Sequence, residues 1–390
     1  MIRPPLEVAD IVRTYGTAFI ERHHRWLKVQ HLKVLRAIAA CRTAALGGHV
    51  EQCDSCGQQA IAYNSCLNRH CPKCQGAARQ KWLAKRSAEL LPVPYYHVVF
   101  TIPHVLAPIA LQNKAIVYSI LFRTAAETLL QIAADPHHLG AEIGFLTVLH
   151  TWGQTLLGHP HLHCVVPGGG RSPDHRQWIA RGPRFFLPVK VLSVVFRGKF
   201  LAAIERAFQQ HKLTLAGQFA PLQSPPAFAA LLRRAAQRKW VVYCKRPFAG
   251  PAQVLTYLSR YTHRIAIANS RLLNMSDGRV TFRWRDYAHG RQTRTMTIDA
   301  DEFLRRFLLH VLTPGFVRIR YFGLLANRHR TQLLNLCRSH LKATASSLLP
   351  VTPVHLCHHC HRGTMHLIER LSSSQLSNRL SGQPPEENSS

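Results

Sequence analysis

The chain has 390 residues, of which 46% are hydrophobic and 18% charged, so it is long enough for two or three globular domains. Lys and Arg total 50 against 19 Asp and Glu, and 38 of the 50 are Arg, giving a formal net charge of +31. This composition excludes wholesale disorder and predicts a polyanionic partner, because guanidinium groups suit bidentate phosphate contacts.

Targeting and membrane signals are weak. The N-terminus MIRPPLEVADIVRTYG has no apolar signal-peptide region, and the most apolar stretch, 115–134, carries Arg123 and Glu127 and predicts a core helix. We therefore expect a cytoplasmic, nucleoid-associated protein with no membrane partner. Eleven Cys in such a compartment indicate metal binding rather than disulfides.

The first part of the chain predicts a helical, Cys-containing domain over 1–92. Apolar residues at helical spacing predict one or two helices within 6–45. Residues 49–76, rich in Cys, Asn, Gly and Pro, predict a small irregular module, which a basic amphipathic helix follows up to Pro92.

The second domain, 93–330, alternates between strand and helix patterns. Strands are predicted at 95–102, 142–149, 161–167 and 240–244, helices at 105–134, 190–210 and 251–263, and a β-meander at 265–298. This order predicts an α+β fold, an α/β sandwich around a mainly antiparallel sheet. The segment 299–342 is predicted to be helical and basic. A C-terminal region, 331–370, carries a basic helix and a possible second Cys pair, and the polar tail 371–390 predicts disorder.

Two cysteine pairs stand at metal-binding spacing. Cys53-x2-Cys56 and Cys71-x2-Cys74 are separated by 14 residues, which suits four thiolates around one structural Zn²⁺. Neighbouring Cys41, Cys66, His49 and His70 are alternatives that could replace a ligand or build a second site.

A third pair, Cys357-x2-Cys360, is half a metal site. Its candidate partners are His355, His361, His366 and Cys337. The alternative is that this pair is exposed to solvent and binds no metal. The remaining cysteines, Cys164 and Cys244, lie in predicted strands and are expected to be core residues.

Two further pairs carry candidate chemistry. His161 and His163, two apart on a predicted strand, project from one face and could hold a divalent cation. Tyr257 and Tyr261, four apart on a predicted helix, share a face, so that a phenolate could attack a phosphodiester, flanked by phosphate-binding Arg260 and Arg264. Surface histidines and a core aromatic stripe are the structural alternatives.

Together these motifs resemble the HUH two-tyrosine rolling-circle transposases of the insertion sequence 91 family. The resemblance spans about residues 40–330 and rests on the segments SCLNRHCPKCQ, HVVFTIPH, LHTWGQTLLGHPHLHCVVPGGG, WVVYCKRPFAGPAQVLTYLSRYTHRIAIAN, VTFRWRDY and FLRRFLLHVLTPGFVRIRYFGLLANRHR. It implies cleavage and joining of single-stranded DNA through a covalent 5′-phosphotyrosine, with a zinc-binding domain ahead of the catalytic domain.

The resemblance also assigns roles to residues. It implies that His161 and His163 bind Mg²⁺ or Mn²⁺ and that Tyr257 and Tyr261 are the nucleophiles. For the third metal ligand we predict Gln154, because an antiparallel neighbour can bring its amide oxygen beside the imidazoles. The alternatives are His159, Gln253 and His263.

The expected partner is DNA, chiefly single-stranded or hairpin ends of a mobile element. No G-x-x-x-x-G-K-[ST] motif occurs, so we expect any unwinding to come from a host helicase. Two other functions fit the same residues: a replication initiator or relaxase with the same nicking chemistry, and a non-catalytic zinc-dependent DNA-binding protein. The sequence sets no oligomeric state.

Overall fold

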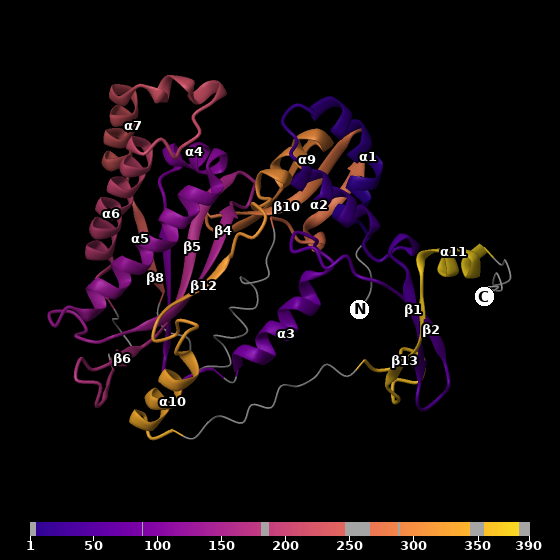
Figure 1. Cartoon of the computed structure of the whole chain (residues 1–390). Coiled ribbons are helices and arrows are strands. Elements are labelled where there is room, and N and C mark those ends of the chain that lie inside the picture. Colours follow the sequence, from indigo (N-terminus) through magenta and orange to yellow (C-terminus); the bar gives the residue numbers. More distant parts are fainter. Residues whose placement is uncertain are drawn as a thin grey trace. The chain divides into compact units, whose positions relative to one another are not determined.

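The computed structural model describes residues 5–87, 89–180, 187–245, 266–287, 289–343 and 355–381 (Figure 1). Helices are mixed with strands, and every strand pair in these ranges is antiparallel, which confirms the predicted α+β class. The chain divides into two compact units, each built from separate stretches. The first comprises Met1–Ala84, His263–Val311 and Pro350–Ser390, and the second comprises Lys85–Thr262 and Leu312–Leu349.

The second unit is built on a five-stranded antiparallel sheet with the order β12-β4-β5-β3-β8. Its strands are β3 (Tyr95–Thr101), β4 (Gly144–Trp152), β5 (Gly158–Pro167), β8 (Val241–Lys245) and β12 (Ile319–Gly323). A separate two-stranded sheet joins β6 (Gly169–Arg171) to β7 (Trp178–Ala180). The strands β4 and β5 form a hairpin within the large sheet, with β12 paired to β4 and β3 paired to β5.

Helices pack on one face of this sheet. In the described part of the unit the helical elements are η2 (His104–Leu106), α4 (Ala107–Gln112), α5 (Lys114–Ala134), α6 (Val189–Gln209), η3 (Gly217–Gln223), α7 (Pro225–Gln237) and α10 (Arg330–His340). Side chains of α5 and α6 form one apolar core with alternate residues of β3 and β5. By length and composition α5 could cross a membrane, yet 61% of its most apolar window is buried inside the protein. It is a core helix, as its charged residues predict.

Two elements of this unit depart from the sequence-based expectation. The stretch 299–342 is not helical throughout, because β12 forms the edge of the central sheet by pairing with β4. Helix α7 was not predicted, although Pro225 at its first turn is a helix-start signal and its Phe228, Leu231 and Leu232 face the core. Strand β12 has five residues, and its place in the sheet depends on pairing with the distant strand β4.

The first unit contains a helical part with a β-meander. Its elements are α1 (Val8–His23), α2 (Val29–Ala40), most of α3 (Gln75–Ser87), η4 (Asn269–Arg271), β9 (Leu272–Ser276), β10 (Arg279–Asp286), β11 (Gln292–Asp299) and α9 (Ala300–Leu309). Helix α1 packs on α2 and α9, and Arg22 binds Asp301 through two hydrogen bonds of 2.7 and 2.8 Å. Residues 266–311 therefore belong with α1, and the units do not follow the expected contiguous boundaries 1–92 and 93–330.

The rest of the first unit is a small three-stranded sheet with the order β13-β1-β2. It consists of η1 (Ala44–Leu46), β1 (Gly48–Cys53), β2 (Gln59–Tyr63), β13 (Met365–Leu371) and α11 (Ser373–Ser381). Figure 1 shows the yellow β13 beside the indigo β1 and β2. The prediction of disorder from 371 onward is wrong for 373–381, because Leu376 of α11 is fully buried against Val50 and Leu371.

Candidate metal centres

A group of three histidines lies on one face of the central sheet. His150 comes from β4, and His161 and His163 come from β5. One nitrogen of each ring lies within 4.8 Å of the others, and His150 and His163 are buried while His161 is half-buried. Three imidazoles at this separation can hold one divalent ion with coordination positions left for substrate oxygens. We refer to them as the histidine triad.

The strand register explains why these three rings meet. His150 lies directly opposite His161, and Val148 lies opposite His163. Because residues two apart on a strand share a face, all three imidazoles project from the same side of the hairpin. On the other side, the opposed Leu149 and Leu162 are fully buried in the apolar core. The core thus fixes the hairpin register that brings the histidines together.

Hydrogen bonds to Nδ1 orient two of the rings. His161 Nδ1 lies 2.6 Å from the carbonyl oxygen of His159, and His163 Nδ1 lies 2.8 Å from Nε2 of His97 on β3. Burial lowers the pKa of His97 to about 4, so that its ring is neutral and its Nε2 can accept a hydrogen bond from the Nδ1–H of His163. Both triad rings would then offer Nε2 to a metal, the arrangement typical of metal-bound histidines.

The third member of the group is not the residue expected from the sequence. Gln154 lies in the turn between β4 and β5, beyond the end of β4, whereas His150 lies within the strand opposite His161. The structure thus brings His150, which the sequence did not single out, together with His161 and His163, and the role of Gln154 as a ligand remains a prediction. A hairpin turn placed between Gly153 and Gly158 would have predicted this pairing from the sequence.

The expected nucleophiles and their neighbours lie outside the described residues. These are Tyr257 and Tyr261, the flanking Arg260 and Arg264, and the alternative ligands Gln253 and His263. Their roles remain predictions. His159, the remaining alternative ligand, is exposed and contributes its backbone carbonyl to the orientation of His161.

Two groups of four cysteines occur in the first unit. The first group is Cys41, Cys66, Cys71 and Cys74, and the second is Cys53, Cys56, Cys357 and Cys360. The predicted single site of Cys53, Cys56, Cys71 and Cys74 is thus corrected, because each of its pairs joins a different second pair. Cys41 and Cys66, which the sequence offered as alternatives, join Cys71 and Cys74, whereas the sequence did not reveal that Cys53 and Cys56 join Cys357 and Cys360.

The first cysteine group joins the C-terminal end of α2, which carries Cys41, to the segment before α3, which carries Cys66, Cys71 and Cys74. Cys41 caps the C-terminus of α2, and its Sγ lies 3.5 Å from Cys74 Sγ, as does that of Cys66. The four thiols share hydrogen bonds, which lower the pKa of Cys41 and Cys74 and raise the pKa of Cys66 and Cys71, so that the group shares negative charge. A thiolate is the form that binds metal.

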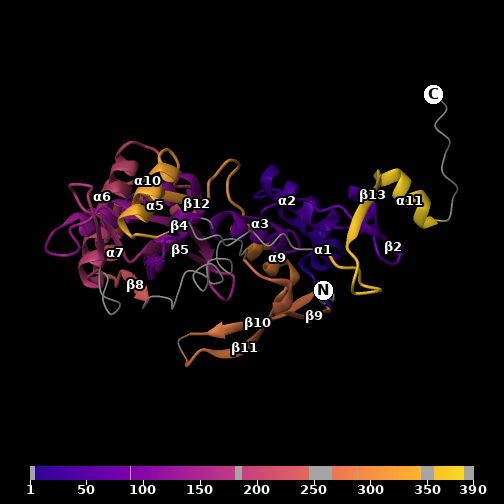
Figure 2. The ribbon, with the colours of Figure 1, turned by 90° about the horizontal axis from the view of Figure 1, so that it is seen from below.

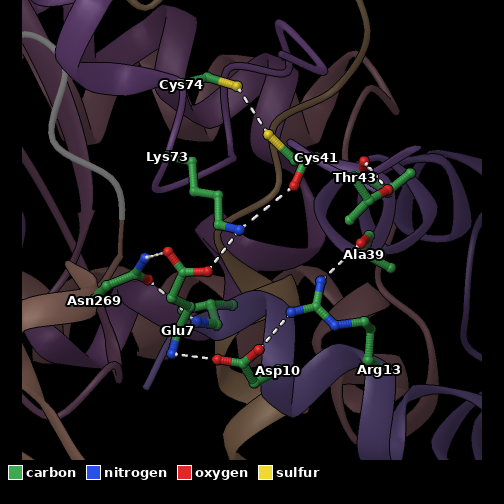
Figure 3. Close-up of polar contacts among 11 residues, drawn as sticks. Glu7, Asp10, Arg13, Ala39, Cys41, Thr43, Lys73, Cys74 and Asn269 are labelled. Carbon is green, nitrogen blue, oxygen red and sulfur yellow. Dashed lines mark hydrogen bonds and ion pairs between the residues drawn. The ribbon is translucent and has the colours of Figure 1, made fainter. Parts of the chain in front are cut away.

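Lys73 ties this group to helix α1 (Figure 3). Its ammonium group donates to the carbonyl oxygen of Cys41 at 3.4 Å and pairs with buried Glu7 at 2.6 Å. Asn269 in turn accepts a hydrogen bond of 3.1 Å from the backbone N–H of Val8. The cysteine group is therefore part of the folded body of the first unit.

A basic ribbon is a further feature of the first unit. Figure 2 shows β10 and β11 as a long two-stranded ribbon that extends away from α9. Arg283 and Arg285 on β10 are exposed, the intervening Trp284 is half-buried, and Tyr287 at the end of the ribbon is 61% exposed. Basic and aromatic side chains in this alternation suit nucleic-acid contacts.

Comparison with known proteins identifies the family. Residues 11–102 match the model described as "Transposase zinc-binding domain", and residues 144–332 match that described as "Putative transposase". The chain is 59% identical over 338 residues to "Putative transposase y4qJ" of Sinorhizobium fredii (strain NBRC 101917 / NGR234), covering 87% of this chain and 85% of that protein. The chain belongs to the insertion sequence 91 family of transposases.

A second relative extends the comparison. The "Transposase for insertion sequence element IS801" of Pseudomonas savastanoi pv. phaseolicola is 27% identical over 333 residues, which cover 83% of this chain and 75% of that protein. A solved metal-bound structure of conjugative relaxase TrwC with oriT DNA is similar over 43% of this chain and 70% of its own, at 12% identity and a TM-score of 0.23. The transposase acts on DNA, in keeping with its net charge of +31.

Proposed function

We propose that this transposase cleaves and rejoins single-stranded DNA by tyrosine attack at a metal ion held by His150, His161 and His163. The observation that carries the proposal is the convergence of these three rings on one face of the β4–β5 hairpin. Tyr257 or Tyr261 supplies the attacking oxygen. The result is a transposition through single-stranded intermediates that mobilises an insertion sequence.

In this proposal the histidines hold the metal ion and a tyrosine attacks the phosphate. A bound divalent ion polarises the scissile phosphate and lowers the cost of developing negative charge. His159 and His97 keep the rings of His161 and His163 in one tautomer through their contacts with Nδ1, so that the ligands need no rearrangement. The apolar core beneath the hairpin keeps the triad rigid.

In the cleavage step the tyrosine hydroxyl loses its proton and its oxygen forms a bond to phosphorus. The bond from phosphorus to the 3′ oxygen of the preceding nucleotide breaks, and that oxygen leaves as a 3′ hydroxyl. Each bond formed replaces one of the same kind, so a 3′ hydroxyl can later reseal the strand without ATP. Two tyrosines, Tyr257 and Tyr261, allow donor and target strands to be held at once.

The donor set bears on the choice of metal. Mg²⁺ prefers oxygen ligands and binds imidazole poorly, whereas Mn²⁺ and later divalent ions accept nitrogen more readily. Of the two expected ions, three imidazoles therefore favour Mn²⁺ over Mg²⁺. A titration of cleavage against each ion separates them by the concentration needed for half-maximal rate.

Structural zinc and DNA contacts complete the proposal. The family's zinc-binding domain match covers Cys41, Cys66, Cys71 and Cys74, four thiols that leave no open coordination position. We assign them one structural Zn²⁺. We further propose that single-stranded or hairpin element ends are the preferred DNA, bound in part by Arg260 and Arg264, and that a host helicase supplies unwinding.

The test is formation of a covalent adduct on labelled single-stranded element ends with Mn²⁺. We expect wild-type protein to form the adduct and His161→Ala/His163→Ala to form none while DNA binding is retained, because most affinity comes from phosphate contacts elsewhere. His137→Ala, which alters an exposed loop histidine, is the matched control and should behave as wild type. An undiminished adduct in the double variant would refute the triad as the metal site.

A further inference from the structure

We propose that Cys53, Cys56, Cys357 and Cys360 form a second zinc site, which fastens the C-terminal segment 355–381 onto the N-terminal zinc module. The first two residues lie within the matched zinc-binding domain, but the last two lie outside both family matches, which cover 11–102 and 144–332. The ligand set thus joins two regions that are some three hundred residues apart in the sequence.

The sulfur positions fit a tetrahedral tetrathiolate site. Cys53 Sγ lies 3.7 Å from Cys360 Sγ, and Cys56 Sγ lies 3.8 Å from Cys357 Sγ. Four sulfurs at a Zn–S distance of about 2.3 Å stand about 3.8 Å apart at tetrahedral angles. A disulfide would need about 2.05 Å, so these contacts have the spacing of ligands around an ion rather than of bonded pairs.

The two cysteine pairs are built alike. The backbone N–H of Gly57 donates to the carbonyl of Cys53 at 3.1 Å, and that of His361 donates to the carbonyl of Cys357 at 3.0 Å. Both donors, Gly57 and His361, have left-handed backbone, with φ of 71° and 56°. The same turn therefore occurs twice, and each copy points two sulfurs toward the other.

Backbone groups are arranged around the sulfurs as they would be around thiolates. The N–H groups of Ser55, His359 and Gly363 point at Cys53, Cys357 and Cys360 respectively, each at 3.4 Å. Such donors stabilise negative charge on sulfur. A Cβ on Gly363 would collide with Cys53 Sγ and with Ser55, so glycine is required where the two turns close on each other.

Neighbouring contacts hold the two segments in this register. Strand β1 ends at Cys53, directly opposite Met365, the first residue of β13. Asp54 accepts a hydrogen bond of 2.8 Å from the N–H of Thr364 and lies 3.2 Å from Nε2 of His366.

The apolar cluster of this region, Val50, Leu371 and Leu376 with Ala44 beside it, is small. A module with so little core depends on a metal for its stability.

Metal counting tests the proposal on the full-length protein. In a His161→Ala/His163→Ala background, which removes two imidazoles of the histidine triad as zinc ligands, we expect native mass spectrometry and elemental analysis to give two zinc ions per chain, and one when Cys357→Ser/Cys360→Ser is added. Cys66→Ser/Cys71→Ser should also leave one. Cys244→Ser, which removes a half-buried thiol on β8 outside both groups, is the control and should leave two.

A measurement on wild-type protein covers variants that fail to fold. Replacement of zinc by ¹¹³Cd²⁺ should give two cadmium resonances with the shift of four sulfur ligands. One zinc in the His161→Ala/His163→Ala background, with no loss when Cys357→Ser/Cys360→Ser is added, would overturn the second site. A denatured, metal-free mass that is lower than that of the reduced chain by four hydrogens would replace it with two disulfides.

Discussion

The cysteine groups and the histidine triad are two different solutions to holding a metal ion. Each cysteine group offers four sulfurs and leaves no room for a substrate atom, whereas the triad offers three nitrogens and leaves coordination positions open. The comparison teaches that ligand number and type separate a centre that stabilises the fold from one that could take part in the reaction.

The two kinds of centre also differ in how they are assembled. The triad comes from one hairpin, whose register is fixed by opposed core residues such as Leu149 and Leu162. The second cysteine group brings together two segments that share only a small apolar cluster, so the metal itself would supply the stability that burial supplies to the triad. Each prediction below tests one side of this contrast.

The largest effect is expected from losing a cysteine centre. Cys41→Ser/Cys71→Ser removes two ligands of the first group, and structural zinc in small modules is worth about 10–16 kcal/mol of folding free energy. We expect the first unit to unfold, seen as loss of amide-proton protection there while the central sheet of the second unit stays protected. Protection in the first unit equal to that of wild type would show that the cysteines are ordinary core residues.

Loss of the triad should instead abolish cleavage and spare the fold. His150→Ala is the sharpest single change, because it removes the ligand that the register places opposite His161. We expect no measurable covalent adduct and an unchanged thermal midpoint. Gln154→Ala is the matched control, and it should retain cleavage; the reverse pattern would restore Gln154 as the third ligand.

The sequence anticipated the local features of these centres and missed the long-range ones. The helices of 6–45, the strands of 95–102 and 161–167 and the meander follow from periodicity, and the structure has them as α1, α2, β3, β5 and β9 to β11. The spacing of the cysteines also identified the three Cys-x2-Cys pairs. It could not show that Cys357 and Cys360 return to β1 or that β12 joins the sheet, because both depend on pairing between distant segments.

The tyrosine variants should show a third pattern, in which the two cysteine centres and the histidine triad are intact and only the covalent step fails. Tyr257→Phe and Tyr261→Phe each retain the ring and remove the attacking oxygen. We expect each single variant to impair complete transposition and the double variant to form no protein–DNA adduct, with zinc content and Mn²⁺ affinity unchanged. An adduct that persists in the double variant would assign the nucleophile elsewhere.

A smaller effect, on metal affinity, is expected from changing His97, the buried residue that contacts the triad at His163. His97→Leu removes the group that contacts His163 Nδ1 at 2.8 Å, and loss of such a partner weakens metal binding by about 10- to 100-fold. His97→Gln retains an acceptor and should recover part of that affinity. Calorimetric titration with Mn²⁺ measures both, and equal affinity in His97→Leu and wild type would show that His97 only fills space.

The smallest effect concerns affinity for DNA, which the contrast between the centres predicts to depend on neither metal. Arg283 and Arg285 are exposed on the β10 ribbon and suit phosphate contacts, each of which releases counterions on binding. Arg283→Ala/Arg285→Ala should weaken binding to single-stranded DNA several-fold and reduce the slope of log affinity against log salt by about 1.4, that is about 0.7 per lost phosphate contact on a single strand. Arg123→Ala, which changes an exposed arginine of the core helix α5, is the control and should leave the slope unchanged.

Fluorescence anisotropy over a range of salt concentrations gives the slopes. If the ribbon variant kept the wild-type slope while a chelator lowered DNA affinity, the metal centres themselves would carry the binding, and the separation between fold, chemistry and affinity would fail.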